Sequence, residues 1–249
     1  MSMLGPYASW NKETGYAVWD HPTAEYTGIF ERINVGIKGI IHVGMWDFVE
    51  YGCYTKLVGN KVVGVEANPD VYKTMAKPVA DQWGFKCFNE FTSDKDGEVR
   101  NFYFAGEGSS LYQGQPAWNK HTSIKVQTKT LATVLDENNI DPAEYDFLNI
   151  DAEGSELDIL KGYERYLEHV NVIDLETSYD DRHLSGASHD KIASWLSERG
   201  FELKEQSPTY DSQQWGDSVF VRVDRELPPF VDGNAGNAIY GEKYLENSR

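Results

Sequence analysis

The sequence predicts an α/β fold built on a doubly wound, mostly parallel sheet of Rossmann type. Three observations predict it. Short apolar runs without polar alternation recur along the chain, segments of helical length lie between them, and several of the runs end on an acidic residue. Continuous apolar runs are typical of strands buried on both faces, as in a parallel sheet covered by helices.

The first half of the alternation begins after an aromatic, polar segment at residues 1–35, which we interpret as an N-terminal arm or lid. Strands are expected over 39–44, 61–66, 85–91, 97–104 and 124–130, with helices over 46–58, 71–82 and 131–137. Glycine interrupts the first run at Gly39 and Gly44. Asn68-Pro69-Asp70 supplies turn and cap residues at the start of the second helix.

The second half continues the same pattern. Strands are expected over 145–151, 170–176, 201–205 and 218–222, and helices over 155–168 and 191–199. Gly200 closes the last helix as a C′ glycine. Neither a repeat nor a linker divides the chain, so we expect a single domain over 1–249, with a core at 36–223 and a polar C-terminal tail at 224–249.

Charge limits the class of partner. The 249 residues contain 23 Lys+Arg and 40 Asp+Glu, and 23 − 40 gives a net charge of −17. Nucleic-acid backbones and anionic membranes are bound largely through Lys and Arg, so an acidic chain without a basic run disfavours both. We therefore expect a small-molecule or carbohydrate acceptor rather than nucleic acid.

Cysteine content and hydropathy point to a cytoplasmic protein. Cys53 and Cys87 are the only cysteines, too few for a disulfide framework. No apolar run reaches 18 residues, and the first residues lack the pattern of a signal peptide.

Acidic residues gather where the expected strands end. Glu66 ends the second strand, Asp151 and Glu153 follow the strand at 145–151, and Glu176 ends the next one. In an open α/β sheet, ligands bind at the carboxyl ends of the strands. Any single one of these acids could simply cap the helix that follows it. Because four of them converge on one edge, we expect a functional site there.

The spacing between Gly44 and Glu66 fits a nucleoside cofactor, whose ribose a Rossmann-type acid binds about 20 residues after the glycine. NAD fits this spacing as well. The segment after Gly44 lacks the G-x-G-x-x-G pattern, however, and contains the bulky Trp46 and Phe48. A pyrophosphate needs those glycines for close backbone contact, so S-adenosylmethionine fits better than NAD. No Tyr-x-x-x-Lys pair supports an oxidoreductase either.

A longer motif follows the strand expected over 145–151. The segment Asp151-Ala-Glu-Gly-Ser-Glu-Leu-Asp-Ile-Leu-Lys-Gly162 resembles the D-x-E-G-x-E-x-x-x-L-K-G signature of FkbM-type S-adenosylmethionine-dependent methyltransferases. Further similar segments are Val65-Glu-Ala-Asn-Pro69, Thr92-Ser-Asp-Lys-Asp-Gly97, Ser109-Ser-Leu111 and Val126-Gln-Thr-Lys-Thr-Leu131, in the family's order over roughly residues 38–205. The resemblance implies a seven-stranded class I methyltransferase fold with an antiparallel last strand, and methyl transfer to a hydroxyl oxygen, often on a sugar.

The resemblance also implies roles for individual positions. The residues it assigns to the cofactor are His42, Gly44, Met45, Trp46, Glu66, Ala67, Asn68, Thr92, Ser93 and Asp151. Gly44 and its neighbours would lie against the methionine part, Glu66 would hold the ribose hydroxyls, and Ala67 and Asn68 would flank the adenine. Two positions depart from the family pattern: His42 replaces a common Asp, and Phe48 replaces the second glycine of the first loop.

An alcohol acceptor must lose its proton as it attacks, so the site needs a base. Asp151 and Glu153 are the candidates by position. A divalent cation such as Mg²⁺ or Mn²⁺ could serve instead, held by Asp151 and Glu176 and completed by Asp180 or Asp181, in resemblance to some sugar O-methyltransferases of this fold. Glu153 and Glu156 could equally cap the next helix. A non-catalytic binding module that retains the fold is the remaining alternative.

Overall fold

The computed structural model of the chain describes residues 8–11, 16–19, 24–48, 50–106, 108–113, 122–178, 186–208 and 215–231. At its centre lies a seven-stranded sheet in the order β10-β11-β9-β8-β3-β4-β5. The strands are β3 (Ile40–Val43), β4 (Val62–Glu66), β5 (Lys86–Asn89), β8 (Phe147–Ile150), β9 (Val172–Ser178), β10 (Phe201–Pro208) and β11 (Trp215–Arg222). Only β11 runs antiparallel to its neighbours β9 and β10, which confirms the predicted fold class.

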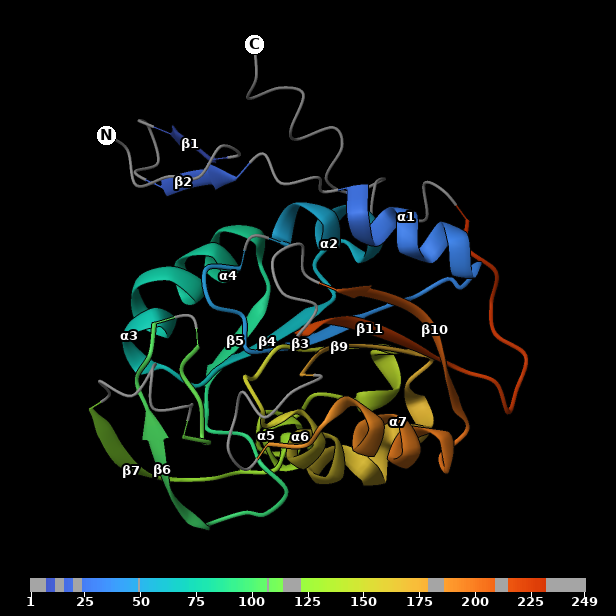
Figure 1. Cartoon of the computed structure of the whole chain (residues 1–249). Helices are drawn as coiled ribbons and strands as arrows, with labels where there is room; N and C mark the ends of the chain where they lie inside the picture. The colour runs from blue at the N-terminus through green and yellow to red at the C-terminus, as the bar shows by residue number, and fades with distance from the viewer. Residues whose placement is uncertain are drawn as a thin grey trace.

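Helices cover both faces of this sheet (Figure 1). On one face lie α1 (Ala24–Ile33), α2 (Tyr51–Val58) and α4 (Lys77–Trp83), and on the other α5 (Leu131–Glu137), α6 (Glu156–Tyr163) and α7 (His189–Ser197). The central strands supply both cores because their side chains alternate between faces. Ile41 and Val43 of β3 pack in the cluster under α5 and α6, whereas Ile40 packs in the cluster under α1 and α2.

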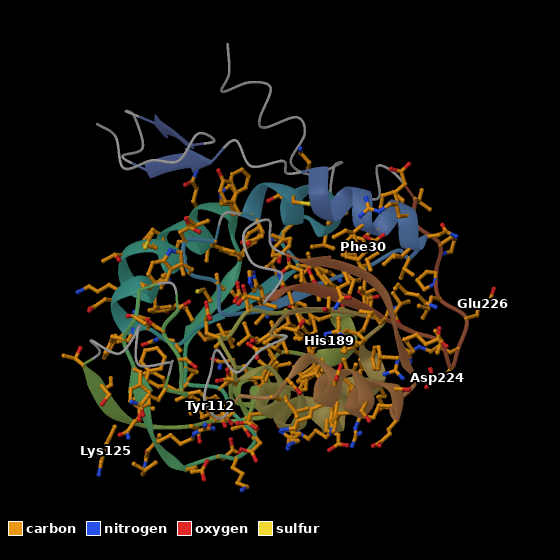
Figure 2. The ribbon with its side chains drawn as sticks, viewed as in Figure 1. Phe30, Tyr112, Lys125, His189, Asp224 and Glu226 are labelled. Carbon is orange, nitrogen blue, oxygen red and sulfur yellow. The ribbon has the colours of Figure 1, made fainter. Side chains whose placement is uncertain are left out.

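The N-terminal segment contains regular structure that the sequence pattern did not indicate. β1 (Ala8–Asn11) and β2 (Tyr16–Trp19) form an antiparallel pair, and α1 follows them. Phe30 of α1, labelled in Figure 2, is fully buried and meets Phe147 edge-to-face with ring centroids 5.0 Å apart. Residues 24–33 of the predicted arm are therefore a helix packed on the sheet.

Helix boundaries also differ from the predictions. The helix expected over 46–58 begins only at Tyr51, because Trp46 and Phe48 adopt left-handed backbone conformations that end any helical run. The helix expected over 71–82 is α3 (Pro69–Val71), a π-helical turn at Tyr72–Ala76 and α4. Pro78 at the start of α4 lacks the N–H that a regular α-helix would use, which accounts for the irregular turn before it. The helix expected over 155–168 ends at Tyr163 and continues as a 3₁₀ stretch to His169.

Two further strands stand apart from the sheet. β6 (Val99–Tyr103) and β7 (Ser123–Gln127) pair with each other and form a two-stranded antiparallel ribbon beside the carboxyl end of the sheet (Figure 1). Phe102 and Val126 of this ribbon bury against Leu111 in a small separate cluster. The ribbon thereby adds a wall next to the edge where the parallel strands end.

The chain after β11 runs back across the face that carries α1. Residues 224–231 contain no helix or strand, and Gly36 donates a backbone hydrogen bond to the Pro228 carbonyl at 2.8 Å. Leu227 and Phe230 pack against the cluster beneath α1 and α2. The division of the chain into one domain with an arm and a tail stays a prediction, since residues 1–7 and 232–249 lie outside the described ranges.

Candidate functional site

A cavity of about 360 Å³ opens at the carboxyl ends of the parallel strands. Its size is within the usual range for small-molecule and cofactor sites. It runs across neighbouring strand ends, from Glu176 on β9 through Asp151 after β8 and Gly44 after β3 to Glu66 on β4. The lining residues are Val43, Gly44, Met45, Trp46, Asp47, Glu50, Glu66, Ala67, Glu90, Phe91, Thr92, Phe102, Ser109, Ser110, Leu111, Asp151, Ala152, Glu153, Ser155, Ile159 and Glu176.

The floor of the cavity is a close contact between two strand ends. Gly44 has φ +86°, and a Cβ at this position would lie 1.6 Å from the Asp151 carbonyl oxygen. The amide of Gly44 donates to the Val65 carbonyl at 2.9 Å, and the amide of Asp151 donates to the Val43 carbonyl at 2.9 Å. Only glycine fits this position, because any side chain would collide with the backbone of Asp151.

The loop after Gly44 keeps a tight turn in spite of its bulky residues. Trp46 and Phe48 have φ values of +44° and +58°, and the Phe48 amide donates to the Met45 carbonyl at 2.7 Å. Phe48 is fully buried, with its ring 5.5 Å from that of Phe85. The residue that replaces the family's second glycine thus takes a glycine-like backbone conformation and turns its side chain into the core, away from the cavity.

Glu66 is held in place by backbone amides. Its Oε2 accepts from the Trp46 amide at 2.9 Å and its Oε1 from the Asn68 amide at 2.7 Å. Burial raises the pKa of this carboxyl, and the bonds from Asn68 and Trp46 oppose that rise. Each carboxylate oxygen can accept more than one hydrogen bond, so Glu66 can still bind hydroxyl groups in the cavity.

The cofactor-binding residues predicted at 67–68 and 92–93 separate into two groups. Ala67 and Thr92 line the cavity, together with the aromatic Phe91. Asn68 does not: its Oδ1 caps the next helix by accepting from the amides of Asp70 and Val71 at 3.1 and 3.4 Å. Ser93 is fully buried behind the lining residues, where its hydroxyl accepts from Arg100 at 2.9 Å.

His42 lies beneath the cavity and is absent from its lining. Its Nδ1 is 3.3 Å from the Tyr54 hydroxyl, which also accepts from the Asn149 side-chain amide at 2.7 Å. Burial lowers the pKa of His42 to about 3, so the imidazole is neutral at physiological pH. This buried network joins α2 to β3 and β8, and in the structure His42 supports the strand ends from below.

Three carboxylates meet at the other end of the cavity. Asp151, Glu153 and Glu176 each place an oxygen within 4.8 Å of the others. Desolvation within the cavity and the neighbouring carboxylates raise the pKa of Asp151 well above its usual range, and the pKa of Glu176 is raised for the same reasons. The structure therefore brings together the predicted catalytic and metal-binding residues. Asp180 and Asp181, the possible further ligands, lie outside the described residues.

The turn that carries Glu153 is fixed by Glu156. The Glu156 Oε1 accepts from the amides of Ala152 and Gly154 at 3.2 and 2.9 Å. Glu153 has φ +52°, an unusual backbone conformation for this residue type. Of the two acids considered as helix caps, Glu156 takes the structural position, and Glu153 takes part in the carboxylate group.

Several lining residues were not predicted as site residues. Phe102 and the Ser109–Leu111 segment come from the ribbon region, and Asp47 and Glu50 come from the loop before α2. The Ser109-Ser110-Leu111 motif was a signal in the sequence, but only the tertiary structure shows that it forms a wall of this cavity. Glu50 gave no signal: its Oε2 is buried without a hydrogen-bond partner among the described residues, and burial raises its pKa to about 7.

Comparison with known proteins gives a family and a set of structural neighbours. The family model described as "Methyltransferase FkbM domain" matches residues 35–203. No curated protein matches the sequence.

Among solved structures, the chain is similar to TrmK of M. capricolum in complex with S-adenosyl-homocysteine (TM-score 0.46, 11% identity, covering 90% of this chain and 82% of that one). It is also similar to magnesium protoporphyrin IX methyltransferase of Synechocystis (TM-score 0.45, 10% identity, covering 82% of this chain and 77% of that one). A third neighbour is an S-adenosylmethionine-dependent methyltransferase of Aquifex aeolicus (TM-score 0.44, 12% identity, covering 82% of this chain and 95% of that one).

Proposed function

Because this chain belongs to the FkbM family of S-adenosylmethionine-dependent methyltransferases, we propose that it transfers the methyl group to a hydroxyl oxygen of a small or carbohydrate acceptor, such as a sugar of a glycan. The observation that carries the proposal is the group of three carboxylates at one end of the cavity, beside the Gly44 floor. This is where the acceptor and the methyl group would have to meet. The expected cytoplasmic location is part of the same proposal.

The lining of the cavity changes in character along its length in a way that fits the cofactor. Ala67, Phe91, Phe102 and Leu111 make one end apolar and suited to a purine. Glu66 follows on the next stretch as an acceptor for ribose hydroxyls. Gly44 then lines the stretch where the methionine part would lie. The acidic end attracts the positive sulfonium and ammonium groups.

The proposed reaction needs a base and close positioning. S-adenosylmethionine, when bound, supplies a methyl group on a positively charged sulfur. As the acceptor oxygen takes up the methyl group, a carboxylate oxygen of Asp151 or Glu153 would accept the hydroxyl proton. Asp151 is the stronger candidate because its backbone is fixed against Gly44 at the floor of the cavity. Fixed geometry of this kind supplies much of the rate acceleration in a displacement reaction.

A divalent cation is the alternative to a protein base in this proposal. Asp151, Glu153 and Glu176 offer only oxygen ligands, which is the donor set that Mg²⁺ and Mn²⁺ prefer. Three carboxylates within 4.8 Å also repel one another, and a cation would relieve that repulsion. These three residues would hold the ion, which would lower the pKa of an acceptor hydroxyl. Titration with Mn²⁺ followed by electron paramagnetic resonance tests this: the Glu176→Gln variant should bind at least about tenfold more weakly.

The central experiment is calorimetric titration with S-adenosylhomocysteine and, in parallel, with NAD. We expect saturable binding of the first and none of the second. A methyl-transfer assay against a panel of hydroxylated acceptors, including glycans, then tests turnover. The Asp151→Asn variant should lose turnover while it still binds S-adenosylhomocysteine.

Each alternative predicts a different result. Binding of S-adenosylhomocysteine without turnover on any acceptor would favour the non-catalytic binding module. Full activity of Asp151→Asn would remove this residue from the reaction. Binding of NAD alone would replace the proposed cofactor.

A further inference from the structure

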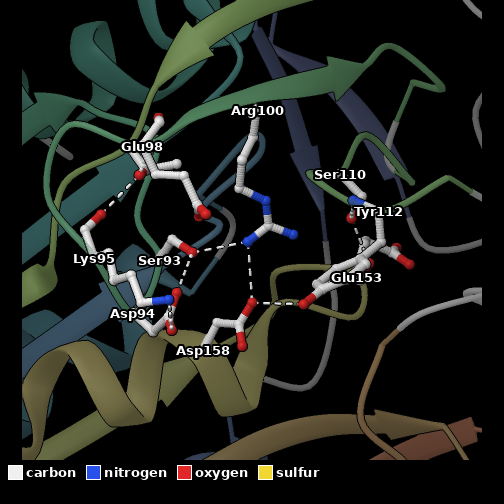
Figure 3. A network of polar contacts seen from close by, with 10 residues as sticks. Ser93, Asp94, Lys95, Glu98, Arg100, Ser110, Tyr112, Glu153 and Asp158 are labelled. Carbon is white, nitrogen blue, oxygen red and sulfur yellow. Dashed lines mark hydrogen bonds and ion pairs between the residues drawn. The ribbon is translucent and has the colours of Figure 1, made fainter.

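A partly buried polar network lies beside the cavity without lining it (Figure 3). Arg100 of β6 donates through Nη1 to the Ser93 hydroxyl at 2.9 Å and to Asp158 Oδ2 at 3.0 Å. The Tyr112 hydroxyl donates to the same Asp158 oxygen at 2.5 Å, and the Arg100 guanidinium carbon lies 4.6 Å from the centroid of the Tyr112 ring. Three separate segments, β6, α6 and the loop at 109–112, are joined at a single carboxylate.

This network ends on the wall of the cavity. The Tyr112 amide donates to the Ser110 hydroxyl at 2.9 Å, and that hydroxyl donates to the Glu153 carbonyl at 2.6 Å. Ser109, Ser110 and Leu111 all line the cavity, as does Glu153. The wall at 109–111 and the turn that carries one of the candidate bases are therefore held together next to Tyr112.

The same chemistry occurs a second time in the chain, away from the cavity. Arg165 forms an ion pair with Asp136, the Tyr166 hydroxyl donates to Asp136 at 2.6 Å, and the Arg165 guanidinium carbon lies 5.0 Å from the Tyr166 ring centroid. Those two charged side chains are 53% and 46% exposed, against 18% and 17% for Arg100 and Asp158. Exposed ion pairs contribute little to stability, so burial is what distinguishes the network beside the cavity.

We propose that Tyr112, fixed by Asp158 and Arg100, is a positioning residue that sets the affinity of the cavity for the nucleoside cofactor. The inference rests on the proposed function. A wall that is already ordered costs less conformational entropy when a ligand binds, so the network raises affinity without touching the ligand. Leu111 and Phe102 are the side chains it holds toward the apolar end.

The test compares Tyr112→Phe with Tyr166→Phe, because each variant removes one hydroxyl from the same kind of triad. S-adenosylhomocysteine binding, measured by calorimetry, should weaken about three- to tenfold for Tyr112→Phe, which corresponds to the net contribution of one typical hydrogen bond. It should stay within about twofold for Tyr166→Phe, which leaves the cavity wall intact. In turnover, Tyr112→Phe should raise KM for the methyl donor and leave kcat nearly unchanged. Equal affinity in both variants and the unmutated protein would overturn the proposal.

A second measurement separates this inference from the proposed function. Hydrogen–deuterium exchange without any ligand should show faster exchange of the amides at 109–112 in Tyr112→Phe and unchanged exchange there in Tyr166→Phe. If the unmutated protein binds no S-adenosylhomocysteine, the proposed function fails, and the affinity role of Tyr112 fails with it. If that protein binds the ligand but exchange at 109–112 is the same in all three proteins, the positioning role alone is wrong.

Discussion

At the scale of single residues, the site tolerates backbone strain where burial offsets it. Phe48 takes a left-handed conformation that costs about 1–2 kcal/mol in a residue with a Cβ. Its fully buried ring gains about 1.5–3 kcal/mol over an exposed one. The two contributions balance or favour the observed turn, which explains how the loop after Gly44 keeps its shape without a second glycine.

Glu66 carries a sharp prediction about the cofactor. Replacing it with Ala removes the carboxylate that would bind the ribose and also frees the Trp46 and Asn68 amides. We expect the dissociation constant for S-adenosylhomocysteine to rise about tenfold or more, since hydrogen bonds to charged groups are strong. Calorimetry measures this. The exposed Glu98→Ala variant serves as control, and an unchanged constant in Glu66→Ala would refute the assignment to the ribose.

Glu50 makes stability depend on pH. Burial, together with Asp47 and Asp217, raises its folded-state pKa from 4.5 to about 7. In the folded protein the Glu50 carboxyl therefore stays protonated up to about pH 7, whereas in the unfolded chain it ionises near pH 4.5. Its contribution to the free energy of unfolding is fully present below pH 4.5 and is lost as the pH rises through about 7. Glu50→Gln mimics the protonated form. It should therefore match the unmutated protein at pH 4.5 and exceed its stability by about 1–3 kcal/mol at pH 8.

Denaturant unfolding at the two pH values checks this difference, with the exposed Glu98→Gln as the matched control. A stabilisation of Glu50→Gln that is the same at both pH values would contradict the raised pKa.

At the scale of elements, α6 connects the family signature to the side of the cavity that Thr92 lines. Gly162 lies inside this helix, and a Cβ there would stand 2.2 Å from the Ser93 carbonyl oxygen. The helix therefore packs backbone to backbone on the segment at 92–93, next to the lining residue Thr92. Asp158 on the same helix anchors the Arg100 network. One helix thus positions two walls of the site.

This packing reverses the usual effect of a glycine substitution. Glycine to alanine in a helix interior normally stabilises by up to about 1 kcal/mol. For Gly162→Ala we expect destabilisation of about 1–3 kcal/mol, because the new methyl overlaps a backbone oxygen that cannot move freely. Thermal unfolding measures it. Gly108→Ala is the control, since a Cβ there would meet nothing closer than 3.9 Å, and equal melting temperatures of the two variants would contradict the packing.

At the scale of the whole molecule, charge supports the proposed class of acceptor. The net charge is −17, and the ionisable lining residues in the described part of the chain are all acidic: Asp47, Glu50, Glu66, Glu90, Asp151, Glu153 and Glu176. Such a cavity attracts a cation or a neutral ligand and repels phosphates.

Among the described helices, none combines the length and the apolar character that crossing a membrane requires.

The corresponding prediction concerns RNA. Fluorescence anisotropy with a labelled RNA should show no binding at 150 mM salt and only marginal binding at 50 mM, because few phosphate contacts can release counterions. A methylation assay with the same RNA should give no product. Salt-dependent binding in the micromolar range would show that a local basic surface outweighs the overall charge.

The positions of the central strands along the chain, and the acids that follow them, can be predicted from the amino-acid sequence alone. Apolar runs mark strands 39–44, 61–66, 145–151 and 170–176 because burial on both faces favours apolar side chains at most positions of a strand. The signature that begins at Asp151 is a local feature of the chain and indicates the family without any knowledge of contacts. The family match over residues 35–203 confirms it.

Which of the predicted residues reach the cavity depends on tertiary contacts that the sequence does not reveal. His42, Asn68 and Ser93 lie next to lining residues in the sequence, but their side chains bind Tyr54, the start of α3 and Arg100 instead. The wall at 109–111, held by Tyr112, and the buried Glu50 depend on contacts between segments far apart in the chain. Local periodicity carries no information about such contacts, because it records which face of an element is apolar and not which element that face will meet.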